Sequence, residues 1–218
     1  LLQGYIALNL NDINGGTVRL QLGRHTMNVG SRRLVARNIY RNTINTFTGI
    51  NGTWKSPSGY MTRAFYVLPV NRLPSDRPSL LDNGISFDEE DFDRQFWGVY
   101  AEKTNLFSAV AGQVYLFGLH EDDNATRNTR NRNFVTTGFY LTRRPAKGKF
   151  DFELESVYQL GKSRASTAAT DVTDLDHAAH FQHLVAGYTL DIPNSLRLVF
   201  QFDYASGDRN PADNKNNR

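Results

Sequence analysis

The chain has 218 residues and no cysteine, which allows one large all-β domain and excludes a disulfide scaffold, a cysteine-based metal site and a thiol enzyme. Mean hydropathy is −0.50 and no apolar run approaches the length of a transmembrane helix, although a membrane β-barrel needs apolar residues only at alternate positions. The net charge of +3 is unevenly distributed, because residues 13–75 contain arginine and lysine but no aspartate or glutamate, a composition typical of nucleic-acid binding or of a pore lining.

A sequence period of two runs along the chain from its start. Apolar and polar side chains alternate in several segments, as in a strand that has one face in an apolar environment. These segments predict roughly ten antiparallel strands, over about residues 5–10, 17–22, 43–50, 60–70, 94–101, 106–119, 133–142, 150–155, 178–190 and 196–204.

The connections between these strands alternate in length. Short turns are expected within 11–16, 51–59, 102–105, 143–148 and 191–195, and long loops within 24–42, 71–93, 120–132 and 161–177. This alternation is typical of outer-membrane barrels, in which short turns face the periplasm and long loops lie outside. We therefore expect residues 1–218 to be a single outer-membrane β-barrel domain that is incomplete at both ends, so that the chain is a piece of a longer transmembrane barrel.

The last predicted strand shows which face meets which solvent. Leu196, Leu198, Phe200 and Phe202 should face the membrane, because a wall in lipid must be apolar on its outside. The residues between them should line the lumen, namely Arg197, Gln201 and Asp203.

Basic residues of the first quarter of the chain are the main candidates for a pore lining. Fixed guanidinium groups along a wall can bind the carboxylates of an acidic solute through two parallel hydrogen bonds. The candidates on predicted strands or at their ends are Arg19, Gln21, Arg24 and Arg63, and those in the first long loop are Arg32, Arg33, Arg37 and Arg41. Our hypothesis is that this loop folds toward the lumen and constricts it; in the alternative, its arginines face solvent or bind lipopolysaccharide phosphates.

Three acids and three histidines could indicate other chemistry. Asp151, Glu153 and Glu155 share one strand face about 7 Å apart, too far for a shared proton or a compact ion site. We expect them to line the lumen and to pair with arginines on neighbouring strands. On a strand His180 points away from His177 and His183, so no zinc site is expected. No catalytic pattern is present, and neither an enzyme nor a cofactor is expected.

Several short motifs, taken in their order, resemble the alginate-export family of outer-membrane porins. They are Gly23-Arg24-His25, Gly30-Ser31-Arg32-Arg33-Leu34-Val35, Ala64-Phe65-Tyr66, Gly98-Val99-Tyr100-Ala101, Ala186-Gly187-Tyr188-Thr189 and Asp203-Tyr204-Ala205-Ser206-Gly207-Asp208. The resemblance implies a barrel of about 18 strands in the bacterial outer membrane. It also implies an arginine-rich, anion-selective lumen and passive export of an acidic polysaccharide. The chain departs from the family pattern at His25 and Thr48.

We therefore expect a porin for an alginate-like polysaccharide or another anionic solute. An uptake porin for small solutes is the first alternative, and a soluble β-rich protein that binds polyanions is an alternative of another class. The expected partners are the anionic solute, outer-membrane lipid and lipopolysaccharide, with periplasmic export proteins at the short turns and no nucleic acid.

Overall fold

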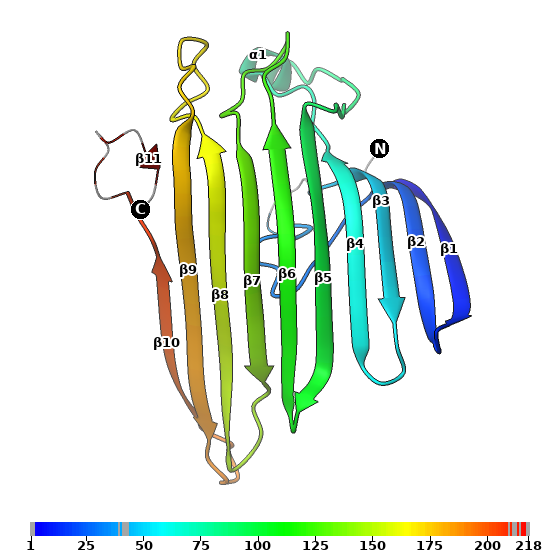
Figure 1. Ribbon diagram of the computed structural model, residues 1–218, viewed down its shortest axis with the longest axis vertical. Helices are drawn as coiled ribbons and strands as arrows, with labels where there is room; N and C mark the ends of the chain where they lie inside the picture. Colours follow the sequence, from blue (N-terminus) through cyan, green and yellow to red (C-terminus); the bar gives the residue numbers. More distant parts are fainter. Residues whose placement is uncertain are drawn as a thin grey trace.

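The computed structural model describes residues 3–38, 40, 44–208, 210, 213 and 215–216, and these form an all-β protein (Figure 1). The long strands are β1 (Gly4–Ile13), β2 (Gly16–His25), β3 (Phe47–Lys55), β4 (Tyr60–Pro69), β5 (Arg94–Phe107), β6 (Val110–Glu121), β7 (Asn133–Arg143), β8 (Lys149–Ser163), β9 (Leu175–Thr189) and β10 (Arg197–Ala205). A short helix, α1 (Arg77–Leu81), lies between β4 and β5, and a two-residue strand, β11 (Lys215–Asn216), pairs with β9. Within the described ranges no helix is long and apolar enough to cross a membrane.

The strands form one sheet in which spatial order follows chain order from β1 to β10. Each long strand is antiparallel to the one before it, which confirms the predicted antiparallel all-β fold. The two outer strands of this order, β1 and β10, each pair with a single long strand in the described part of the chain.

The connections between strands alternate in length, as the sequence predicted. Short turns join strands at residues 14–15, 56–59, 108–109, 144–148 and 190–196, and long loops span 26–46, 70–93, 122–132 and 164–174. The long loops leave from one end of the sheet, called the loop end here, and the short turns lie at the other, the turn end (Figure 1). In the first turn, Asn14 and Gly15 have φ values of 50° and 69°, as a type I′ hairpin turn requires.

The prediction for β3 was wrong in its bounds. The strand was expected to end near residue 50, with a short turn within 51–59 that included Asn51 and Gly52. In the structure both residues lie inside the strand, where the Asn51 side chain donates a hydrogen bond of 2.8 Å to Gln21 Oε1 of β2. The turn instead falls at residues 56–59, where Gly59 adopts a φ of 83°.

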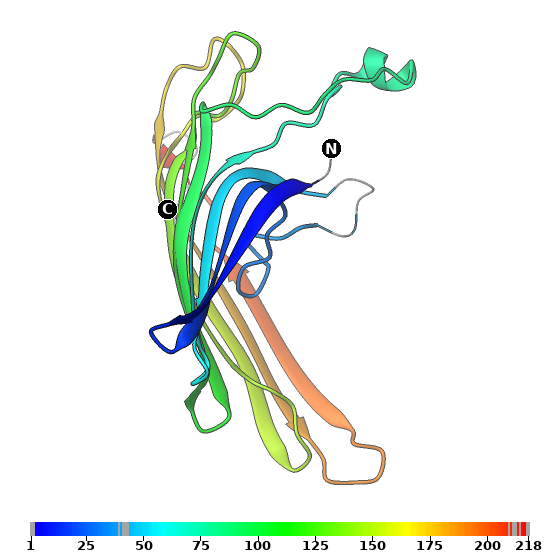
Figure 2. The same cartoon turned by 90° about the vertical axis from the view of Figure 1, so that its right-hand side faces the viewer.

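The sheet is curved (Figure 2), and its two faces differ in composition. The convex face exposes apolar side chains, among them Ile6, Leu8, Leu20, Leu22, Ile50, Val99, Leu116, Phe139, Phe150, Leu160, Leu198 and Phe200. The concave face is covered in its middle by residues 26–38 of the loop 26–46, which fold back along the sheet (Figure 2). Met27, Val29 and Val35 of this loop join a buried cluster with Phe65, Val67, Tyr100, Tyr115, Phe117 and Val157 of the strands. The hydrophobic core therefore lies between this loop and the concave face.

Ion pairs connect the other three long loops at the loop end. Asp91 of the loop 70–93 accepts two hydrogen bonds, of 2.8 and 3.0 Å, from the guanidinium of Arg127 in the loop 122–132. Arg164 lies 2.5 Å from Asp123 and 3.5 Å from Asp174, and so joins the loops 122–132 and 164–174. These contacts hold the three loops in one arrangement.

We expect the contact between Asp91 and Arg127 to weaken in acid. The hydrogen bond from Arg127 is the main cause that lowers the pKa of Asp91 below its usual value. A lowered pKa gives stability that is fully present above the ordinary carboxyl value and is lost as pH falls through the lowered one. The pair is partly exposed, so the effect should be about 1 kcal/mol or less, or up to about fivefold in local opening.

Hydrogen exchange, corrected for the intrinsic rate at each pH, would measure this opening. Protection in the loop 70–93 should fall as pH drops below about 4, the ordinary carboxyl pKa. The Asp91→Asn variant should already be less protected at pH 6 and should lose this part of the pH dependence. Equal protection in the two proteins at every pH would contradict the prediction.

Candidate functional site

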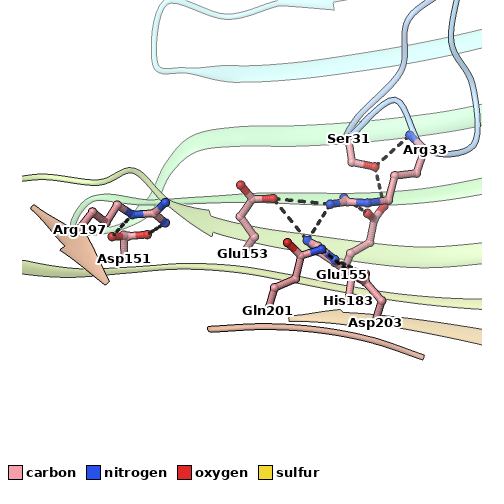
Figure 3. A network of polar contacts seen from close by, with 9 residues as sticks. All are labelled: Ser31, Arg33, Asp151, Glu153, Glu155, His183, Arg197, Gln201 and Asp203. Carbon is pink, nitrogen blue, oxygen red and sulfur yellow. Dashed lines mark hydrogen bonds and ion pairs between the residues drawn. The ribbon is translucent and has the colours of Figure 1, made fainter. Parts of the chain in front are cut away.

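The candidate site lies on the concave face, where residues 31–33 of the loop 26–46 meet β8, β9 and β10 (Figure 3). At its centre is Glu155 of β8, whose side chain is only 1% exposed. Its carboxylate accepts hydrogen bonds from Arg33 Nη1 at 2.5 Å, Ser31 Oγ at 2.8 Å and Tyr115 Oη at 3.0 Å. A buried carboxylate is costly unless it is paired and hydrogen-bonded. Two of these three partners come from the loop, so Glu155 ties the loop to the sheet.

Tyr115 reaches Glu155 because a glycine lies between them. Tyr115 is on β6 and Glu155 on β8, while Gly138 of the intervening β7 pairs with Tyr115 in the register. A Cβ atom at Gly138 would lie 2.5 Å from Tyr115 Oη. Any larger residue would therefore displace the tyrosine ring from its path to the carboxylate.

His183 of β9 connects the loop to the next strand. Its Nε2 lies 2.7 Å from Arg33 Nη2, and its Nδ1 lies 2.5 Å from Asp203 Oδ1 on β10. A guanidinium can only donate, so in this arrangement Nε2 accepts from Arg33 while Nδ1 faces the Asp203 carboxylate. Gln201 Nε2 donates a further bond of 2.6 Å to Asp203. Glu155, His183 and Asp203 are direct register partners on three adjacent strands. The pairing of these strands therefore positions all three side chains of this hydrogen-bonded chain.

A second ion pair lies on the same concave face, closer to the turn end of the sheet. Arg197 of β10 donates to both oxygens of the buried Asp151 of β8 (Figure 3). The guanidinium crosses β9 at Gly187, where a Cβ atom would lie 2.7 Å from both Arg197 Nη2 and Asp151 Oδ1. As at Gly138, a missing side chain lets partners meet across an intervening strand.

Comparison with known proteins identifies the family of this chain. The family model described as "Alginate export" matches residues 1–218. The chain belongs to the alginate-export family. No curated protein and no solved structure matches it. The resemblance carried by the ordered motifs is therefore confirmed.

In this alginate-export protein the three acids of β8 have partners, but not all on strands. Asp151 pairs with Arg197 on a strand, whereas Glu155 pairs with Arg33 of the loop. Glu153 lies 3.7 Å from Arg33 Nη2 and 3.6 Å from His183 Nε2. Sequence reasoning placed the arginine partners on neighbouring strands, and it did not identify His183, whose contacts depend on strand register.

The remaining strand candidates occupy two different places. Arg63 donates from Nη1 to Asn28 O of the loop at 2.8 Å and from Nε to Thr53 Oγ1 at 3.3 Å. Arg19 of β2 pairs with Thr53 of β3, which pairs with Arg63 of β4, so Arg19 and Arg63 lie in one row across the concave face. Gln21 lies on the same face, two residues further along β2. Arg24 is apart from them, because it lies one residue before the end of β2 and pairs with Glu90 and Asp88 of the loop 70–93.

The remaining loop candidates are more exposed. Arg32 and Arg37 are exposed on the loop 26–46, and neither forms an ion pair with a described residue. Arg32 has a φ of 66°, and the backbone of Arg37 donates to Asn28 Oδ1 at 2.9 Å. Arg41 lies outside the described residues.

The three histidines of β9 lie on both faces of the sheet, as strand alternation predicted. His180 stacks on Tyr158 and contacts Tyr204 on the convex face. His177 contacts Phe134, and His183 belongs to the wall described above. Within the described ranges no group of three or more histidine, cysteine or acidic side chains is placed to hold a metal ion.

Proposed function

We propose that this chain forms part of a closed barrel in the bacterial outer membrane and passes an anionic solute, an acidic polysaccharide of the alginate type, through its lumen. The family match over residues 1–218 carries this proposal. The concave face would bound the lumen, and strands beyond β1 and β10 would complete a barrel of about 18 strands.

The convex face supports the membrane part of the proposal. Phe200 and Leu198 are each 60% exposed, Phe150 is 70% exposed and Ile6 is 76% exposed. Exposed apolar side chains on this face from β1 to β10 form a surface far larger than soluble monomers expose. Lipid contact accounts for this face, and barrel closure would remove the two open sheet edges.

The loop 26–46 supports a constricted lumen. It is held on the concave face by buried apolar contacts and by the bonds from Arg33 to Glu155 and His183. Asp151 and Glu155 are already matched by Arg197 and Arg33, so these acids add little net negative charge to the wall. Arg19, Arg32 and Arg37 form no ion pair with a described residue and would give the passage its attraction for anions.

Conductance in a planar bilayer tests the proposed function. The full-length protein should give single channels, a reversal potential that shows anion selectivity in a salt gradient, and current that polyuronate blocks. A cation-selective channel would refute the acidic solute while keeping the pore. Failure to insert into any bilayer would favour a soluble polyanion-binding protein instead.

Charge reversal at Arg19 is the next prediction. Arg19→Glu should lower the anion-to-cation permeability ratio by about twofold or more at low salt, because a fixed charge in a confined lumen is screened only weakly there. Arg19→Lys keeps the charge and should retain the ratio. An unchanged ratio in Arg19→Glu would remove Arg19 from the pore lining.

A further inference from the structure

A basic cleft lies at the loop end of the sheet, apart from the candidate site shown in Figure 3. It has a volume of about 540 Å³, within the range of about 300–1,000 Å³ typical of small-molecule sites. Arg94 and Glu121 are register partners at the ends of β5 and β6, in the alternation that places Tyr100 and Phe117 on the concave face. The cleft therefore opens on the concave side, not among the apolar side chains of the convex face. Its charged lining residues are Arg94, Glu121, Arg127, Arg130 and Arg132.

Two of the four arginines are neutralised by carboxylates. Arg132 donates to both oxygens of the buried Glu121, at 2.6 and 2.9 Å. Arg127 forms the two bonds to Asp91 described above. These bidentate pairs fix both side chains and leave them little attraction for a further anion.

The other two arginines form no ion pair with any described residue. Arg94 donates from Nη2 to neutral oxygens only, Pro69 O at 3.2 Å and Asn71 Oδ1. The Arg130 side chain is exposed, while its backbone carbonyl accepts a bond of 2.7 Å from Arg164 N that fixes its position. The cleft therefore holds four arginines against the carboxylates of Glu121 and Asp91, and the remaining positive charge favours a bound anion.

The rest of the lining suits a sugar. Phe134 and His177 line the cleft and stack on each other with ring centroids 4.4 Å apart, and aromatic rings that line a cleft can pack against a pyranose ring. Thr167 also lines the cleft, and its hydroxyl group can exchange hydrogen bonds with sugar hydroxyls. The ion pairs among the loops hold this arrangement before a ligand arrives, which reduces the entropy cost of binding.

We propose that this loop-end arginine cleft binds a carboxylated sugar unit, with Arg94 and Arg130 holding the carboxylate. The inference rests on the proposed function in one respect, because the concave face must bound the lumen for the transported solute to reach the cleft. Guanidinium groups bind phosphate as well as carboxylate. The stacked rings and the concave position favour a uronate over a lipid phosphate.

Calorimetric titration of the full-length protein in detergent micelles tests this proposal. The three probes are a trimeric uronate, a neutral trisaccharide of the same length and inorganic phosphate. The uronate should bind, and Arg130→Gln and Arg94→Gln should each weaken it by tenfold or more. Arg144→Gln is the matched control, since Arg144 lies in the turn 144–148 at the opposite end of the sheet, and it should leave the affinity unchanged.

Three outcomes would overturn the proposal. They are uronate affinity that is unchanged in both cleft variants, a neutral trisaccharide that binds as tightly as the uronate, and inorganic phosphate that binds as tightly as the uronate with the same sensitivity. Bilayer conductance of the same samples keeps the two proposals apart. A protein that forms no channel but binds uronate through Arg94 and Arg130 would refute the porin and keep the site.

Discussion

Replacing Phe200 with arginine is expected to destabilise the protein folded in a bilayer by about 2–4 kcal/mol, the cost of an arginine on the lipid face of a barrel near the midplane. Phe200 lies on the convex face near the middle of β10 and is 60% exposed. The change tests whether that face meets lipid, because water would solvate the new guanidinium at little cost.

The matched control is Gln201→Arg, one position along the same strand. Gln201 lies on the concave face and already donates to Asp203, so an arginine there gains an acidic neighbour and should change stability by less than about 1 kcal/mol. Urea unfolding in lipid vesicles, followed by the fluorescence of Trp54 and Trp97, measures both variants. An equal loss of stability in the two variants would mean that the convex and concave faces meet the same solvent, which would contradict the prediction.

The faces of the strands could be predicted from sequence because the signal is local. In β10, Leu198, Phe200 and Phe202 alternate with Val199, Gln201 and Asp203, and a period of two specifies opposite faces without knowledge of any other strand. The alternation of turns and loops is equally local. Strand bounds were less secure, since Asn51 and Gly52 carry a turn signal that the pairing of β3 with β2 and β4 overrides.

The partners in the candidate site could not be predicted, because they depend on how distant segments pack. Arg33 and Glu155 are 122 positions apart, and their contact requires the loop 26–46 to fold onto the concave face. The roles of Gly138 and Gly187 could not be predicted from the sequence either. Their role as gaps under Tyr115 and Arg197 becomes visible only when the register is known.

The contact between Arg33 and Glu155 carries the second large prediction. Arg33→Met should lower the free energy of unfolding by roughly 3 kcal/mol, because it leaves the Glu155 carboxylate buried without a counter-charge. The value is at the low end for a buried pair because the Arg33 side chain is 32% exposed. Loss of the polar anchor should also loosen the loop 26–46 and increase channel conductance and its noise.

A second substitution separates the buried charge from the anchor. Glu155→Gln can still accept from Ser31 and Tyr115, so adding it to Arg33→Met should restore part of the lost stability. Arg32→Met is the matched control. The Arg32 side chain, next to Arg33 in the loop, is exposed and forms no ion pair with a described residue. It should change stability by less than about 0.5 kcal/mol.

The two readouts distinguish what holds the loop in place. If Arg33→Met lowers stability but leaves conductance unchanged, the buried contacts of Met27, Val29 and Val35 hold the loop without help from the ion pair. If the double variant regains stability but keeps the higher conductance, the cost lies in the uncompensated carboxylate and the constriction depends on the guanidinium. The second result is expected, because Arg33 is the residue of the loop that bonds both to Glu155 on β8 and to His183 on β9.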